Sequence, residues 1–173
     1  ANTDMSMWFE AVKSGAPQFT ALGGDIETFS AAIGTLANSG IKGAEAGTAL
    51  RNIMLRLSAP AKAGADALGE LGINVFNSEG KMLPFIDIMK QFEKSLDGVA
   101  DEKKAKLLTD IFGARAIGSF QVLMSAGTEE LSKFTNELYN AGGAAETMAN
   151  AQMKSFAGMI EQLKSAWQDK QLS

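Results

Sequence analysis

Three glycines precede an amphipathic segment in the stretch NSGIKGAEAGTALRN, and glycines so placed are candidates for binding a phosphate. Backbone N–H groups at the start of a helix donate to anions, and glycine lets the ligand come close to them. A P-loop, however, needs a Lys-Ser or Lys-Thr pair directly after its last glycine, and Gly47 is followed by Thr48 and Ala49. A dinucleotide-binding turn needs a preceding hydrophobic strand, whereas the residues before Gly40 repeat with the period of a helix. The stretch therefore does not predict a nucleotide site.

Helix geometry explains the same glycines. Gly40 stands one position after the apolar stripe of a predicted helix, where a left-handed residue ends the helix, and Ile41 stands where a Schellman cap places an apolar contact. The pair Gly72-Ile73 repeats this arrangement. The two later glycines of the stretch lie four residues apart, on one face of the next helix, so that a neighbour can approach closely. The residues that we predict to act as structural caps and turns are Gly40, Ile41, Gly43, Gly47, Gly72, Ile73, Gly80 and Gly113.

Paired carboxylates are the next candidates for chemistry, because a glycosidase-type enzyme can work with two carboxyl groups and no histidine. The pairs Asp101-Glu102 and Glu129-Glu130 both stand at predicted helix starts, where negative charge favours the positive end of the helix dipole. Tyr139 and the serines have no visible base partner in the sequence. These positions predict helix starts rather than catalytic sites.

The basic residues do not predict a nucleic-acid surface. The net charge is −4, and nucleic-acid affinity depends on clustered lysines and arginines. The densest basic stretch, Lys103, Lys104 and Lys106, directly follows two acidic residues and is typical of a solvated helix face. Arg115 is the only charged residue in the range 111–128, and an internal salt bridge or a contact to helix carbonyls is favoured over a ligand site.

Composition describes an ordinary globular chain. The 173 residues are 46% hydrophobic and 21% charged, which is enough for a conventional core. There is no cysteine and no histidine, so disulfides and thiolate or imidazole metal sites are excluded, and we expect no cofactor and no metal. We expect no signal peptide, because the start ANTDMSMWFE is acidic, and no membrane span, because the uncharged run 116–128 is too short.

The apolar residues recur with a helical period in almost every segment. One exception is INVFNSEGKML, residues 73–83, where β-forming residues flank a turn containing Gly80 and predict a small β-hairpin. The sequence thus predicts an all-α fold, a compact multi-helix domain with one hairpin and a long C-terminal helix. The predicted helices cover about residues 5–13, 18–22, 25–39, 43–57, 60–71, 84–96, 100–112, 114–125, 128–141 and 145 onward.

The last predicted helix carries an apolar seam with the alternating spacing of a coiled coil. Its members follow one another at intervals of 3, 4, 3 and 4 residues. Such a seam is typical of a helix that packs along a partner. We therefore divide the chain into a helical block, residues 1–143, and a helix leading out of it, residues 144–173. The residues of the seam are Met153, Phe156, Ile160, Leu163 and Trp167.

Three stretches, in this order and at this spacing, resemble the core region of tail tape measure proteins of long-tailed phages and prophages. They are LANSGIKGAEAGTALRNIMLRLSAP, ELGINVFNSEGKMLPFIDIM and LLTDIFGARA. The later stretch GGAAETMANAQMKSFAGMIEQLKSAW is similar to that family's transition into its long helical part. Where the family usually has Ser or Thr before the acidic start of the KKAKLLTDIFG helix, this sequence has Ala100, which leaves Asp101 as the candidate N-cap.

The resemblance implies a structural function without catalysis. Tape measure proteins are long, mostly helical chains that occupy the tail lumen during assembly in the host cytoplasm, set the number of tube rings and leave the tube when DNA is ejected. The implied partners are other copies of the chain, the tail tube, the tail tip and tail assembly chaperones. No sequence-specific nucleic acid is implied, and a membrane is met only during ejection.

Two alternatives stay open from the sequence. One is a peptidoglycan-degrading domain of the kind that some tape measure proteins carry, which would need two of the carboxylates to act as an acid and a base. The other is a membrane-active helical segment used in ejection, which the lack of a sufficiently long apolar run disfavours.

Overall fold

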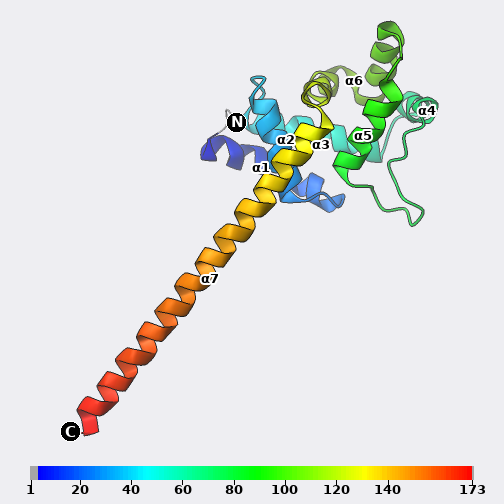
Figure 1. Cartoon of the computed structure of the whole chain (residues 1–173). Coiled ribbons are helices and arrows are strands. Elements are labelled where there is room, and N and C mark those ends of the chain that lie inside the picture. Colours follow the sequence, from blue (N-terminus) through cyan, green and yellow to red (C-terminus); the bar gives the residue numbers. More distant parts are fainter. Residues whose placement is uncertain (1–3, 173) are drawn as a thin grey trace. The chain divides into compact units, whose positions relative to one another are not determined.

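The computed structural model describes residues 4–172, apart from the side chains of residues 143–149, 152, 155, 156 and 170–172. The chain divides into two compact units, Ala1–Asn136 and Glu137–Ser173, and each is described by itself. The predicted all-α fold is confirmed, since helices cover most of the described chain (Figure 1). The helices are α1 (Met5–Ala21), α2 (Ile26–Ala37), α3 (Gly43–Ser58), α4 (Lys62–Leu71), α5 (Phe85–Leu96), α6 (Asp101–Ala126) and α7 (Thr128–Leu172).

The first helix is longer than the sequence predicts. We expected a break at Ser14-Gly15-Ala16-Pro17, but α1 continues through Pro17 to Ala21. Proline costs a helix one hydrogen bond because it has no N–H. Gly15 and Ala16 are buried, and tertiary packing of this kind outweighs a local preference against helix. Likewise α7 continues through the glycines at which we expected it to be interrupted.

The predicted β-hairpin at residues 73–83 is wrong in detail. Within the described residues this segment forms one isolated antiparallel bridge, between Phe76 and Met82, and no strands. The Asn77 N–H donates to the Lys81 carbonyl at 2.8 Å, so the turn uses most of the residues available for pairing. Pro84 then starts the next helix and has no N–H to extend a ladder. The residues that remain on either side of the turn are too few to form a two-stranded β-ribbon.

The core of the first unit contains two clusters of phenylalanine rings. Phe92, Phe112 and Phe120 join α5 to both halves of α6, with ring centroids 4.8 Å apart for Phe92–Phe120 and 4.1 Å apart for Phe112–Phe120. Phe19 contacts the rings of two further phenylalanines, with centroids 5.5 and 5.7 Å away. The rings of Phe19, Phe29, Phe85, Phe92, Phe112 and Phe120 are all at most 3% exposed. Buried aromatic rings of this kind contribute strongly to a core.

Within the described residues, α6 is the one helix with the length and apolarity of a membrane span, contrary to our expectation of none. Its apolar residues Leu107, Leu108, Ile111, Phe112, Phe120 and Leu123 are buried in the first unit. Gly113 interrupts the helix with φ 73° and ψ 172°, so its two halves point in different directions. The apolar character of α6 is therefore accounted for by the core.

Candidate interaction surfaces

The glycines predicted to end helices lie in left-handed backbone. Gly40 has φ +86°, and the Ile41 N–H behind it donates to the Leu36 carbonyl at 3.0 Å. At the end of α4, Gly72 has φ +71°, and the Ile73 N–H donates to the carbonyl of Leu68 at 2.9 Å. Each bond spans five residues, which is the outer bond of a Schellman motif. In both places the N–H groups satisfy helix carbonyls.

The other two glycines of the opening stretch lie where α3 meets α1. A Cβ added to Gly47 would overlap the Ser14 hydroxyl and the Ala11 carbonyl of α1, and a Cβ added to Gly15 would overlap the Gly47 carbonyl. The backbones of the two helices are therefore in direct contact. Gly43 begins α3 with φ +58° and faces Glu10 of α1.

Gly80 and Gly113 both have positive φ. Gly80, with φ +78°, closes the turn after Phe76, and its N–H donates to the Asn77 carbonyl at 3.0 Å. Gly113, with φ +73°, forms the bend of α6, and a Cβ there would lie 3.0 Å from Nη2 of Arg56. Both positions favour glycine because other residues pay a steric penalty in left-handed backbone.

The carboxylate pairs lie at helix starts and are exposed. Asp101 and Glu102 are in the first turn of α6, and Glu129 and Glu130 are in the first turn of α7. The candidate N-cap role of Asp101 is wrong: the N-cap position is Ala100, which has no side-chain capping bond. The carboxylate instead complements the positive end of the helix dipole from within the first turn. No acidic cluster suited to a metal ion occurs in the part of the chain that the structure describes.

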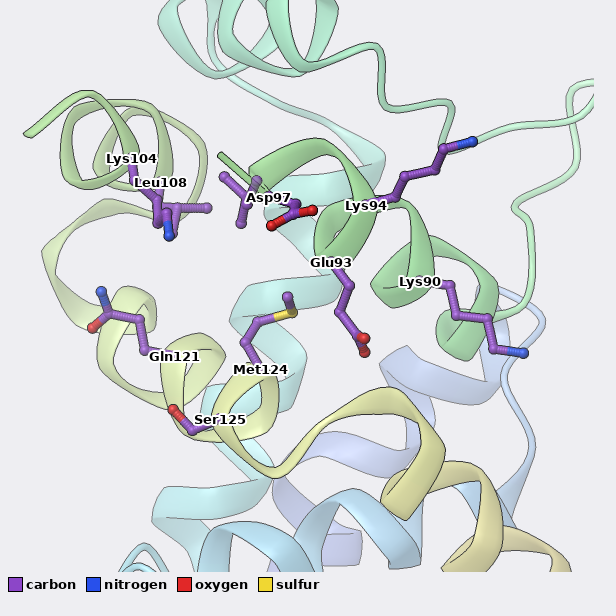
Figure 2. A pocket seen from close by; sticks show the side chains of 10 residues that line it. Lys90, Glu93, Lys94, Asp97, Lys104, Leu108, Gln121, Met124 and Ser125 are labelled. Carbon is purple, nitrogen blue, oxygen red and sulfur yellow. The ribbon is translucent and has the colours of Figure 1, made fainter. Parts of the chain in front are cut away.

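An open groove of about 960 Å³ lies between α5 and the two halves of α6 (Figure 2). Met124 lies across it from Glu93, while the amino groups of Lys90 and Lys94 point away. Both acidic and basic side chains line the groove, so its charge favours neither an anion nor a cation. The lining residues are Lys90, Glu93, Lys94, Leu96, Asp97, Lys104, Leu108, Gln121, Met124 and Ser125.

One contact in this groove connects α5 to the start of α7. Glu93 Oε1 accepts a hydrogen bond from the backbone N–H of Thr128 at 2.6 Å. The first N–H groups of a helix have no acceptor within the helix, and a carboxylate there also interacts with the helix dipole. Sequence reasoning missed Glu93 because the two residues are 35 positions apart and no local pattern links them.

The second unit consists of the larger part of α7, and the seam residues described there are exposed. Met153 is 70% exposed, Leu163 68%, Trp167 63% and Ile160 37%. The side chain of Phe156 lies outside the described residues. Met159, between two seam positions, is 60% exposed, so the apolar surface is wider than the predicted seam. Large exposed apolar residues grouped on one helix are typical of an interaction surface.

The chain is similar in sequence to known phage proteins. The family described as "Phage-related minor tail protein" matches residues 1–113. The chain is 34% identical, over 167 residues and 96% of its length, to the "Tape measure protein" of Pneumococcus phage Dp-1. It is 32% identical, over 164 residues and 92% of its length, to the "Probable tape measure protein" of Escherichia phage P2. No solved structure matches the chain.

The chain therefore belongs to the family of phage-related minor tail proteins. The resemblance to tape measure proteins that the three sequence stretches suggested is confirmed. The chain spans 14% of the Dp-1 relative and 20% of the P2 relative. The comparisons give no support to a peptidoglycan-degrading or a membrane-active function.

Proposed function

We propose that the chain is a non-enzymatic folded block of a tape measure protein, acting in the tail lumen during assembly and tail-length determination. Its first unit serves as an anchor rather than as the ruler. The observation that carries this proposal is the dense packing of the described residues 4–136, with glycine-to-glycine contact between α1 and α3. A single helix of 136 residues would extend about 200 Å, whereas a compact unit of that size has a radius of gyration of about 14 Å.

The second part of the proposal is that α7 begins the helical region that meets other copies of the chain. The seam alternates by 3 and 4 residues, and exposed Met159 widens it. Apolar residues at this spacing associate as coiled coils because they become buried between helices. The remaining partners are proteins of the tail tube and tail tip and tail assembly chaperones, and no sequence-specific nucleic acid or cofactor takes part.

Deletion in the full-length protein tests the anchoring function. We expect a tape measure gene lacking residues 4–136 to yield few or no assembled tails when it complements a phage without its own copy. The matched control deletes an equal number of residues from the helical remainder of the protein and should yield tails that are shorter but assembled. Normal numbers of infectious tails from the first deletion would overturn the proposal.

Mass measurement in solution tests the seam. Analytical ultracentrifugation of the chain extended past residue 173 should give a multiple of the monomer mass, and Leu163→Glu with Ile160→Glu should reduce it to one copy. The matched control, Gln162→Glu with Ser165→Glu, adds the same charge to exposed positions of α7 outside the seam. If the extended chain is a monomer, or if both pairs of substitutions act equally, the seam does not join copies.

A further inference from the structure

Two arginines from different helices line a concavity of about 380 Å³ where α3 passes the bend of α6. Arg56 comes from α3, and Arg115 follows the bend at Gly113 by two residues. We call this concavity the arginine notch. Its lining residues are Asn52, Leu55, Arg56, Phe112, Ala114, Arg115 and Ala116. None of these residues is acidic, and the amide of Asn52 adds a further hydrogen-bond donor.

Both arginines lack a carboxylate partner among the described residues. The ion pairs described there use lysine instead, as in Lys103–Glu70 at 3.0 Å and Lys106–Asp110 at 3.0 Å. Of the two contacts expected of Arg115, an internal salt bridge or a contact to helix carbonyls, the salt bridge is not found in the described part of the chain, where this side chain is exposed. Two like charges at one concavity repel each other, and an anion between them would remove that repulsion.

The bend at Gly113 holds the notch open. Nη2 of Arg56 is 3.0 Å from the place that a Cβ of Gly113 would occupy, so the absent side chain lets the guanidinium lie against the α6 backbone. Beyond the bend the helix starts again at Ala114, whose neighbouring N–H groups form the positive end of the second half. This positive end adds to the field of the two guanidinium groups.

We propose that the arginine notch binds a single carboxylate, presented by an acidic side chain of a partner protein. A guanidinium group matches a carboxylate with two parallel hydrogen bonds, and two guanidinium groups can share its two oxygens. A single carboxylate is favoured over a nucleic-acid backbone, because the residues that line the notch include only two cationic side chains, and nucleic-acid affinity depends on many phosphate contacts. The notch would thus make one specific contact, which would fix the position of a partner protein where α3 passes the bend of α6.

Titration of the whole chain with acetate tests the proposal, followed through the arginine Nε–H signals in ¹H–¹⁵N NMR at constant ionic strength. We expect saturable shifts at Arg56 and Arg115 and none at Arg51, an exposed arginine of α3 that does not line the notch. Either Arg56→Gln or Arg115→Gln should weaken acetate binding about fivefold or more, and Arg51→Gln should leave it unchanged. Arg56→Lys should also weaken acetate binding, because lysine keeps the positive charge but cannot donate two parallel hydrogen bonds to a carboxylate.

Inorganic phosphate and chloride, titrated in the same way, separate a carboxylate site from a general response to anions. The proposal is overturned if acetate produces linear shifts, if Arg51 responds as strongly as the notch, or if phosphate saturates the notch and acetate does not. The wild-type titration alone can give these results, so the test does not depend on the variants. Circular dichroism of each variant checks that its helices are intact.

Discussion

Replacing Gly47 with alanine should destabilise the fold, although alanine is the better helix former. A Cβ on Gly47 overlaps the Ser14 hydroxyl and the Ala11 carbonyl oxygen. The hydroxyl can rotate away, but the carbonyl belongs to the backbone of α1 and moves only if the two helices separate. Separation would also break the hydrogen bond of 3.1 Å from the Ser14 hydroxyl to the Ala44 carbonyl.

The size of the effect follows from two opposing terms. In an exposed helix interior, Gly→Ala stabilises by up to about 1 kcal/mol. Forcing an extra methyl group into a well-packed contact costs about 1–3 kcal/mol, and a backbone neighbour that cannot rotate away places Gly47 at the upper end. The net loss is about 2 kcal/mol, which lowers Tm by about 4–8 °C for a chain of this length.

Thermal unfolding followed by far-UV circular dichroism measures this loss, with Gly118→Ala as the matched control. Gly118 also lies inside a helix, but a Cβ there meets nothing within 4 Å. The control should therefore raise Tm by about 2–4 °C, so the two variants should shift in opposite directions. If both variants raise Tm by the same amount, α1 and α3 are not in backbone contact and the reasoning fails.

Three further substitutions test other parts of the fold. Gly72→Ala should lower the free energy of unfolding in urea by about 1–2 kcal/mol because of the φ of +71°, whereas Gly69→Ala, inside α4 with open space around its Cβ, should leave it unchanged or raise it by up to about 1 kcal/mol. Glu93→Gln should speed hydrogen exchange at the Thr128 amide about tenfold, since the hydrogen bond between the two residues loses its charged acceptor. Unchanged exchange would show that Glu93 does not stabilise the start of α7. Phe92→Ala should lower the free energy of unfolding by about 3–5 kcal/mol, and a loss below about 1 kcal/mol would contradict the aromatic core.

Features that depend on a few neighbouring residues could be predicted from the sequence. Most helices follow from apolar residues at a helical period, because the period directly gives one buried face. The bend of α6 falls at Gly113, where the apolar pattern is broken by a glycine. Family membership could also be predicted, because each of the three stretches that resemble tape measure proteins is a continuous piece of sequence.

Features that depend on residues far apart could not be predicted. The continuity of α1 through Pro17 rests on packing that the sequence around the proline does not reveal. Glu93 reaches Thr128 across 35 positions, and Arg56 lies against Gly113 from another helix. The segment around Phe76 forms one bridge and not a hairpin, because the turn and Pro84 leave few residues to pair. The β propensity of the residues does not reveal how many of them remain for pairing.

Tail length, measured by electron microscopy of negatively stained particles, is the sharpest test of whether the first unit is an anchor and α7 part of the length-determining helix. Removing residues 137–172 from the full-length protein deletes ten helical turns, and we expect assembled tails that are shorter by about 54 Å. Gly47→Ala combined with Phe92→Ala, which weakens the first unit without changing chain length, should reduce the number of tails and leave the length of the remaining tails unchanged. Normal tail numbers at normal length from the double variant, or an unchanged length from the deletion, would contradict the division into an anchor and a helical region.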